Sequence, residues 1–306
     1  METPIISVIV PTFERPASIR SCLDGLARLE FPVEAFEVIV VDDGGRTDLE
    51  PVIATHARRI CVRLVQAAHG GPGAARNAGA AVARGRFLAF IDDDCVPAPG
   101  WLAALARALE EHPDRLAGGL VLNALVSNPY ADASDRISRF VYDYYRRQDA
   151  REWFFTTNNI ALSAELFRAL GGFTTRIPSA TAEDKEFCDR WRERGLALRH
   201  VPEAVVHHAH DLGFGGFLRQ HYNYGRGIFA FRQMRRARTA STLVPEPPGF
   251  YVALVTSPLR SNTHRRSPRA SLLIFAAQLA TMAGALQQAV RGAIGPRENG
   301  SRPTTG

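Results

Sequence analysis

The stretch RFLAFIDDD, residues 86–94, decides the fold, because it joins an apolar run directly to three consecutive acidic residues. Its apolar residues are continuous rather than alternating, which is typical of a strand buried on both faces of a parallel sheet. Similar runs precede it: ISVIVPTF (6–13), EVIVVDDG (37–44) and VRLVQA (62–67). Helix-like segments lie near 16–29, 48–58, 74–84 and 99–111. This alternation predicts βαβ units on a parallel sheet.

Polar residues follow three of these strands at the point where each strand ends. Thr12 and Glu14 follow the first strand, Asp42 and Asp43 the second, and the acidic triplet the fourth. In open α/β sheets the carboxyl ends of the strands form the ligand crevice. We therefore expect these side chains to gather where a ligand binds.

The acidic triplet has two interpretations. Asp92, Asp93 and Asp94 would repel one another next to a buried strand unless a cation compensated them. Mg²⁺ and Mn²⁺ prefer oxygen ligands, often carboxylates together with substrate phosphates. Alternatively, one Asp caps the helix that follows near Pro97 and Pro99.

Four short motifs occur in a fixed order: PTF (11–13), VVDDG (40–44), GPGAARNAG (71–79) and FIDDD (90–94). This series resembles the nucleotide-binding half of the family 2 glycosyltransferases, and the resemblance extends over residues 5–235. It implies the α/β GT-A fold: a mostly parallel nucleotide-binding sheet with flanking helices, here followed by a C-terminal helical extension.

The resemblance implies roles for the residues at the first two strand ends. Pro11, Thr12 and Glu14 would line the nucleotide pocket, and Asp42 or Asp43 would meet the base or ribose. The alternative for the two aspartates is turn chemistry before a glycine, which accounts for one Asp more easily than two.

The resemblance also identifies Asp92 and Asp94 with a DxD motif, in which the last carboxylate holds the metal and the first faces the ribose or sugar. Asp93 is counted among the donor-binding residues. Arg76 would lie by the base or the diphosphate, and its rigid fork at a glycine-rich helix start suits phosphate. The alternative for Arg76 is a surface salt bridge.

In the second half, NNIALSAELFRALGGF (158–173) resembles the segment before the family's acceptor site, and AEDKEFCDRW (182–191) resembles its ED motif. The resemblance implies that Asp184 is the catalytic base. Inverting transfer needs one carboxylate to take the acceptor proton, because a metal carries the leaving-group charge. The alternative is that Glu183, Asp184 and Glu186 only complement the dipole of a helix near 182–194.

Three histidines follow a strand-like run in PEAVVHHAH (202–210). The resemblance implies that one of them completes the metal site; His208 fits best, His210 second and His207 third. We expect Mn²⁺ or Mg²⁺ as the cofactor, and imidazole suits Mn²⁺ better than Mg²⁺. A zinc site is the alternative, although no cysteine has a matching spacing.

The helical segment 217–236 contains HYNYGRG (221–227), which is loosely similar to the QxxRW region of processive family members. No Trp follows Arg226, so we predict a non-processive enzyme. Arg219 and Arg226 are candidates for diphosphate or acceptor contact, or for a solvated face. Five aromatic residues are candidate acceptor contacts unless they bury a helix: Tyr130, Tyr142, Tyr144, Tyr145 and Trp153.

The net charge of +6 is unevenly distributed. Residues 1–218 carry 24 Lys and Arg against 29 Asp and Glu, whereas residues 219–306 carry 13 against 2. A basic tail attracts anionic membranes, nucleic acid or phosphorylated substrates. No nucleic-acid-binding pattern accompanies the charge, so we expect no nucleic acid partner.

The segment SLLIFAAQLATMAGALQQAV (271–290) is about as long as a membrane span. Its three Gln and one Thr favour an amphipathic helix, packed on the domain or lying in the membrane interface. The arginines before it suit an anionic membrane face or a solvated loop: Arg260, Arg265, Arg266 and Arg269.

The four cysteines form no CxxC pair, and the N-terminus lacks the features of a secretory signal. These features predict a cytoplasmic protein, with peripheral contact at the inner face of the membrane left open.

We expect a GT-A domain over 1–240, with a nucleotide-sugar half (1–120) and an acceptor and catalytic half (121–240). A basic, partly helical extension over 241–306 would follow, with an end that is a candidate for disorder. The expected activity is metal-dependent inverting transfer from a nucleoside-diphosphate sugar, preferably a UDP-sugar, to a hydroxyl of a sugar, lipid-linked glycan or small molecule, in glycan, glycolipid or glycoconjugate synthesis. The alternatives are a polyprenyl-phosphate-directed glycosyltransferase at the membrane and a non-catalytic nucleotide- or carbohydrate-binding module.

Overall fold

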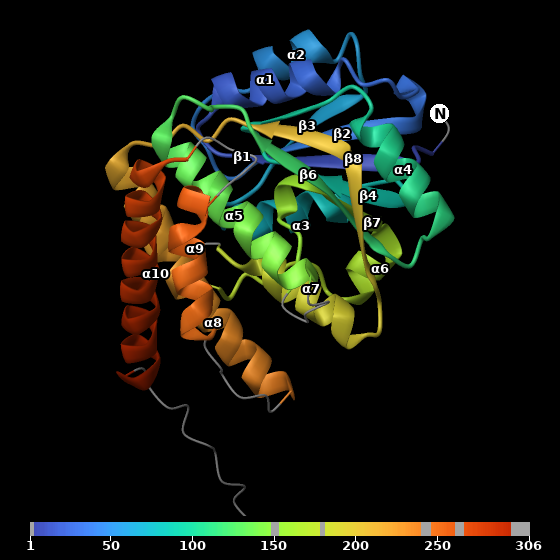
Figure 1. Cartoon of the computed structure of the whole chain (residues 1–306). Coiled ribbons are helices and arrows are strands. Elements are labelled where there is room, and N and C mark those ends of the chain that lie inside the picture. Colours follow the sequence, from blue (N-terminus) through green and yellow to red (C-terminus); the bar gives the residue numbers. More distant parts are fainter. Residues whose placement is uncertain (1–2, 148–152, 178–180, 240–245, 261–265, 295–306) are drawn as a thin grey trace, which may run out of the picture.

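One sheet organises the molecule, and its strands were largely anticipated. The computed structural model describes residues 3–147, 153–177, 181–239, 246–260 and 266–294, and in these the sheet has eight strands in the order β3-β2-β1-β4-β7-β6-β8-β5 (Figure 1). The strands are β1 (Ile6–Thr12), β2 (Phe36–Asp42), β3 (Val62–Gln66), β4 (Phe87–Phe90), β5 (Cys95–Pro97), β6 (Leu116–Asn123), β7 (Ile160–Ser163) and β8 (Leu198–His208).

The sheet has a parallel half and a mixed half. Strands β3, β2, β1 and β4 are parallel, as the βαβ pattern predicts. β7 is antiparallel to both β4 and β6, β8 is parallel to β6, and β5 is antiparallel to β8. The predicted α/β class is therefore confirmed, and the mixed half contains three strands that the sequence did not indicate: β5, β6 and β7.

One strand boundary requires correction. The predicted strand 86–94 ends at Phe90, so the acidic triplet lies in the turn between β4 and β5. Adjacent carboxylates resist burial in the interior of a sheet, whereas a turn at its carboxyl edge leaves Asp92 and Asp94 partly exposed.

Helices cover both faces of the sheet. They are α1 (Pro16–Leu26), α2 (Glu50–His56), α3 (Pro72–Val82), α4 (Trp101–Glu111), α5 (Pro129–Arg147), α6 (Ala164–Ala169), α7 (Glu183–Glu193), α8 (Phe214–Thr239), α9 (Pro248–Arg260) and α10 (Pro268–Ile294), with short 3₁₀ turns at Val33–Ala35 and Thr157–Asn159.

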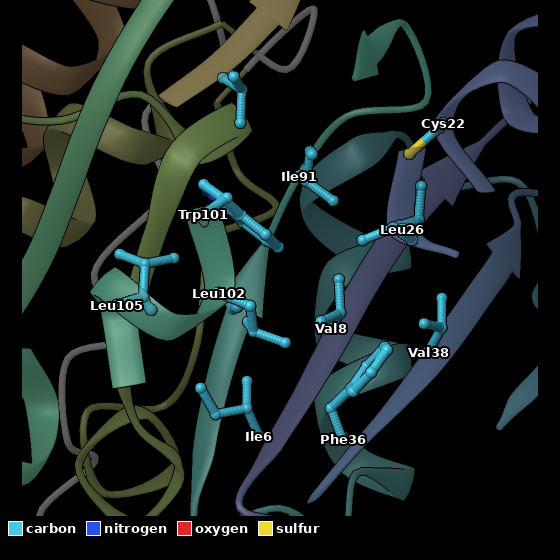
Figure 2. Close-up of a cluster of buried hydrophobic side chains, with 14 of the residues drawn as sticks. Ile6, Val8, Cys22, Leu26, Phe36, Val38, Ile91, Trp101, Leu102 and Leu105 are labelled. Carbon is cyan, nitrogen blue, oxygen red and sulfur yellow. The ribbon is translucent and has the colours of Figure 1, made fainter. Parts of the chain in front are cut away.

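The two faces of β1 enter different hydrophobic cores, which explains its continuous apolar run. All seven residues of this strand are buried. Val8 and Val10 belong to the core under α1, α2 and α4, and Ile9 belongs to the core on the opposite face with α3, α6 and α7. Successive side chains in a strand point to opposite faces, so both faces need apolar residues. Figure 2 shows part of the first core, with Val8 and Val38 on neighbouring strands, Leu26 of α1 above them, and Trp101 and Leu102 of α4 on the other side of the cluster.

A third hydrophobic cluster joins α5, α8, α9 and α10. Its buried residues include Phe217, Phe250, Leu254 and Ile274. In Figure 1 these helices form a bundle beside the sheet, with α10 alongside α8 and α9. The predicted C-terminal helical extension is confirmed, and α9 was missed because its prolines, including Pro258 inside the helix, indicated a break.

Two glycines let α8 and α10 pack backbone against backbone. A Cβ on Gly225 would lie 1.8 Å from the carbonyl oxygen of Thr281, and a Cβ on Gly284 would lie 1.9 Å from that of Tyr222. The residue number falls along α8, from Gly225 to Tyr222, as it rises along α10, from Thr281 to Gly284, so the two helices are antiparallel. Residues 268–291 of α10 form the one helix in the described parts that is long and apolar enough to cross a membrane, with a mean hydropathy of 1.5.

Candidate active site

The acidic turn after β4 is held by residues at the end of β1. Thr12 Oγ1 donates a 2.7 Å hydrogen bond to Asp93 Oδ2. Arg15 Nη1 lies 3.2 Å from Asp93 Oδ1 and 3.4 Å from Asp94 Oδ2. Burial raises the pKa of Asp93 to about 6, although Thr12 and Arg15 act in the opposite direction. Asp93 therefore faces the protein and fixes the turn.

None of the three aspartates caps the next helix. α4 begins at Trp101, and Gly100 stands before it without a side-chain capping bond. The capping interpretation is wrong because β5 separates the acidic turn from α4 and carries the chain away from the helix.

A candidate metal centre forms where β5 pairs with β8. The antiparallel register places Cys95 opposite His208, and His208 Nε2 lies 3.2 Å from Asp94 Oδ1. Ligand atoms of Asp94, Cys95 and His208 all lie within 4.8 Å of one another. Burial would raise the pKa of Asp94, but the hydrogen bond and charge of His208 lower it to about 2. An ionised carboxylate beside an imidazole is a suitable donor set for a divalent transition ion.

The strand register also distinguishes the three histidines. His208 is half-buried against Asp94, whereas His207 is exposed, because alternate residues of β8 point to opposite faces. His210 follows the strand; its ring centroid lies 5.1 Å from that of His208, and its Nδ1 lies 3.4 Å from Gln220 Nε2. His208 is therefore the histidine that lies beside Asp94, and its role as the metal ligand stays a prediction. Cys95 was missed because its proximity to His208 depends on the β5–β8 pairing.

Arg76 connects the acidic turn to the start of α7. Its Nη2 lies 2.5 Å from Asp92 Oδ1, and its Nη1 lies 3.0 Å from Glu183 Oε1. The Arg76 side chain is only 4% exposed, so it is not a surface salt bridge. Gly71, with a φ of 83° that favours glycine, and Pro72 at the first turn begin the helix that carries this arginine.

The acidic residues at the start of α7 have different surroundings. Glu183 pairs with Arg76, and the buried Glu186 pairs with Arg190 and Arg238. Asp184 is partly exposed, and its Oδ1 accepts a 2.7 Å hydrogen bond from the backbone N–H of Lys185. Burial, followed by the charge of Glu183, raises the pKa of Asp184 to about 7. A carboxyl group that titrates near neutral pH is suited to general base catalysis.

Strained backbone precedes this motif. Ala182 has a φ of 151°, which is rare for a residue with a side chain. Such strain is found at sites where the surrounding structure dictates the direction of a neighbouring side chain. Ala182 is the residue directly before α7, which begins at Glu183.

The two aspartates at the end of β2, which were predicted to contact the nucleotide, differ in their hydrogen bonds. Asp43 accepts 2.9 Å hydrogen bonds from the N–H groups of Gly70 and Gly71, and thereby holds the start of α3. Asp42 Oδ1 accepts from Gly45, whereas its buried Oδ2 has no partner among the described residues. A buried carboxylate oxygen without a partner suggests a donor supplied by a ligand.

Pro11 and Glu14 flank the end of β1. Pro11 is buried in the strand, and Glu14 has a φ of 55°. The Glu14 carboxylate accepts hydrogen bonds of 2.6 Å from both Arg46 N and Thr47 Oγ1. Glu14 therefore supports the loop after β2.

Two exposed rings at this edge of the sheet were not anticipated. The centroids of Phe13 and His69 lie 4.6 Å apart at an interplanar angle of 33°, and Phe13 is 45% exposed. Apolar and aromatic residues gathered beside Asp42 and Asp43 provide a surface on which a planar base could stack. The PTF motif contains Phe13, but only the fold brings His69 next to it.

The aromatic stretch before residue 157 is mostly structural. Tyr144 and Tyr145 pack on Phe250 of α9, and Tyr130 packs on Phe217 of α8. Tyr142 is different: its ring packs on Phe154, and its hydroxyl donates to Thr156. Burial, and after it the charge of Asp184, raises the pKa of Tyr142, so acceptor contact through this residue stays a prediction. Trp153 packs on Phe155, and its role as an acceptor contact stays a prediction as well.

Helix α8 contributes a polar chain beside the histidines. Gln220 Nε2 donates to the hydroxyl of Tyr224 at 2.7 Å and contacts His210. Arg219 is exposed in the first turns of the same helix.

Solved structures with the same architecture are glycosyltransferases. A mannosyltransferase from Pyrobaculum calidifontis, in complex with GDP-Man and Mn²⁺, matches 96% of this chain and 88% of its own with a TM-score of 0.64 and 18% identity. TarS residues 1–349 from S. aureus, in complex with UDP-GlcNAc, matches 94% of this chain and 91% of its own with a TM-score of 0.54 and 17% identity. The fold is therefore the GT-A fold.

Curated relatives agree with the fold. Glycosyltransferase AglE of Haloferax volcanii is 25% identical over 73% of this chain and 73% of its own length. The pre-mycofactocin glycosyltransferase of Mycobacterium tuberculosis is 28% identical over 72% of this chain, a match that spans 46% of that protein. The model of glycosyl transferase family 2 matches residues 7–171. This chain belongs to family 2 and is a nucleotide-sugar-dependent glycosyltransferase.

Proposed function

We propose that this enzyme catalyses metal-dependent, inverting, non-processive transfer of a sugar from a nucleoside-diphosphate sugar to an acceptor hydroxyl. The observation that carries the proposal is the Arg76 bridge, because it fixes the acidic turn and the start of α7 on the same side of the molecule. Asp92 precedes the proposed metal ligand Asp94 by two residues, and Glu183 directly precedes the proposed base Asp184, so the bridge holds the two groups that inverting transfer needs through their neighbours.

The metal would be held by Asp94 and His208, with Cys95 adjacent. The fit rests on their converging ligand atoms and on the ionised state of Asp94. When bound, Mn²⁺ or Mg²⁺ would stabilise the negative charge of the departing diphosphate. The imidazole favours Mn²⁺.

Asp184 would accept the proton of the acceptor hydroxyl while the hydroxyl oxygen attacks C1 of the donor sugar. Its raised pKa matches that task, since a base works best when its pKa is near the working pH. Arg76 keeps Asp92 and Glu183 in place, and its positive charge compensates both in a buried environment.

The nucleotide would lie over the carboxyl ends of β1 and β2, where Asp42 has a free oxygen and Phe13 and His69 present their rings. A UDP-sugar is the donor that we expect, and the TarS complex supports it, whereas the mannosyltransferase complex contains GDP-Man. The acceptor would be a sugar, a lipid-linked glycan or a small molecule. The four unbridged cysteines support a cytoplasmic site of action.

A thermal-shift panel tests the donor site. UDP, GDP, dTDP and CDP are each added with Mn²⁺, Mg²⁺ or EDTA to the wild type, Asp94→Ala and the matched control Asp114→Asn. Asp114 is exposed at the opposite end of β6 from the metal centre. We expect one nucleotide to raise the apparent stability only with metal, and only in the wild type and the control. A metal-independent shift that persists in Asp94→Ala would reject the proposed metal site.

Product analysis tests the reaction. With the donor identified, the anomeric configuration of the new bond is compared with that of the donor sugar by nuclear magnetic resonance. Inversion is expected, and retention would exclude the single-displacement role of Asp184. Parallel assays offer a polyprenyl phosphate or a sugar alcohol as the acceptor. Transfer to the polyprenyl phosphate alone would identify the lipid-directed enzyme, and transfer to the sugar alcohol would support the proposed function.

A further inference from the structure

Helix α10 carries an exposed apolar stripe on the face turned away from the rest of the protein. Its members recur three or four residues apart, and each is between 47% and 71% exposed: Leu272, Phe275, Leu279, Met282, Leu286 and Val290. At 1.5 Å per residue this stripe is about 27 Å long. A continuous apolar strip of this size marks an interaction surface rather than scattered exposure.

The opposite face of α10 is already occupied by the protein. Ile274 and Ala277 are buried in the cluster with Phe217 and Leu254. The middle of α10 packs directly on the backbone of α8, where Gly225 faces Thr281 and Gly284 faces Tyr222. Within the described parts of the chain the stripe therefore has no partner, because folding has used the other side of the helix.

This packing excludes a transmembrane role for α10. Crossing a bilayer would carry α8 into the hydrocarbon, since the two helices touch backbone to backbone. α8 bears Arg235 and Arg238, which form ion pairs with Asp189 and Glu186 of the catalytic domain. Ion pairs of this kind are costly in the hydrocarbon core of a bilayer, so α8 stays outside it. Because α10 is packed against α8, α10 stays outside it as well.

The charges around α10 identify the occupant of the stripe. The helix contains no acidic residue, and Arg260, Arg266, Arg269 and Arg291 are exposed near its ends or at the end of α9. A second copy seated on the stripe would bring arginine against arginine with no carboxylate to compensate. An anionic lipid surface complements both the apolar stripe and the arginines. Arg265 lies outside the described residues.

We propose that α10 docks the enzyme onto an anionic membrane surface, with the stripe lying in the plane of the interface and the arginines meeting lipid phosphates. This surface is separate from the catalytic residues, so the inference stands whether or not the proposed reaction is correct. It places the enzyme at the membrane as a peripheral protein.

Vesicle flotation tests this docking with the full chain. Vesicles of phosphatidylcholine alone are compared with vesicles that also contain phosphatidylglycerol. We expect flotation with the anionic vesicles and little with the neutral ones. Leu279→Glu combined with Met282→Glu should lower the bound fraction at least about tenfold. The matched control is Val126→Glu, which adds a charge at an exposed valine of the β6–α5 connection.

A second pair of variants isolates the charge contribution. Arg266→Glu combined with Arg269→Glu should weaken binding to anionic vesicles at least about tenfold, and Arg107→Glu, exposed on α4, should leave it unchanged. Circular dichroism and the nucleotide-induced thermal shift show that each variant is folded.

Two outcomes would overturn the proposal. A wild type that does not float with anionic vesicles but sediments as a dimer, and becomes a monomer with Leu279→Glu and Met282→Glu, would assign the stripe to a second copy. Retention in vesicles after alkaline carbonate extraction would show an integral span instead of a docked helix.

Discussion

The guanidinium Nη1 of Arg76 lies 3.0 Å from Oε1 of Glu183, although 107 residues separate the two in sequence. Arg76 belongs to the glycine-rich segment that opens α3, and Glu183 is the first residue of α7. The contact joins helix α3, next to the parallel half of the sheet, to the helix that carries Asp184. Its second bond, to Asp92, extends the connection to the acidic turn.

Replacing Arg76 should affect both stability and activity. Arg76→Ala leaves the buried Glu183 without its partner, so we expect the free energy of unfolding to fall by about 3–5 kcal/mol in urea denaturation. Arg76→Lys retains the charge but cannot form both bonds at once. We expect a folded enzyme whose kcat falls by about 100-fold through misplacement of the neighbouring catalytic groups.

The control for this prediction is Arg63→Lys, because Arg63 pairs with Glu37 at a distance from the candidate site. Equal activity losses in Arg76→Lys and Arg63→Lys would show that the bridge has no special role.

The activity should depend on pH through Asp184. Because this carboxyl group has a pKa of about 7, the rate should rise with pH to a plateau, with half of the maximum near pH 7. Asp184→Asn should lower kcat by about 10²–10⁴-fold. Initial rates between pH 5 and 9 with saturating donor would measure both effects. A flat profile below pH 7 would argue against Asp184 as the base.

The same pKa predicts a change of stability with pH. The pKa of Asp184 is raised above its ordinary value of 3.8, so folding favours the neutral carboxyl group. Its contribution to stability is complete below about pH 4 and is lost as the pH rises through about 7. Asp184→Asn lacks this loss, so its Tm should match the wild type at acid pH and exceed it above pH 7. Thermal unfolding of both proteins across this pH range measures the difference in Tm. A difference that does not change with pH would contradict the raised pKa of Asp184.

Metal affinity should depend on two residues that are distant in sequence, Asp94 of the acidic turn and His208 of β8. Asp94→Ala and His208→Ala should each weaken Mn²⁺ binding, measured by calorimetry with the nucleotide present, by about 10–100-fold or more. His207→Ala is the matched control, since this exposed neighbour on β8 points to the other face. If His207→Ala weakened the affinity as much as His208→Ala, the β5–β8 register would not define the metal centre.

The close approach of α8 and α10 should tolerate no added methyl group. Gly225→Ala and Gly284→Ala place a Cβ within 2 Å of a backbone carbonyl oxygen of the facing helix, at 1.8 and 1.9 Å. We expect each to lower the free energy of unfolding by about 1–3 kcal/mol. Gly249→Ala, where no atom lies within 4 Å of the added group, should be neutral or slightly stabilising. Urea denaturation would measure the free energy of unfolding of the three variants. Equal values would show that α8 and α10 do not pack backbone against backbone.

Local sequence determined the parallel half of the sheet and the chemistry at its edge. The continuous apolar runs at β1 and β2 are needed because both faces of these strands are buried, and the polar residues at their ends, Thr12 and Asp42, are visible within motifs. The family 2 assignment and the α/β class could be predicted for this reason. The roles of individual site residues remain predictions.

Only the tertiary structure decided which of these groups meet. Cys95 reaches His208 through an antiparallel pairing that spans more than a hundred residues, and Arg76 reaches Glu183 through the packing of α3 near α7. Which face of α10 stays exposed was decided in the same way, by the glycine contacts with α8. Periodicity along the chain reports whether a residue is buried, whereas partners distant in sequence are selected by strand register and helix packing, which depend on the whole fold.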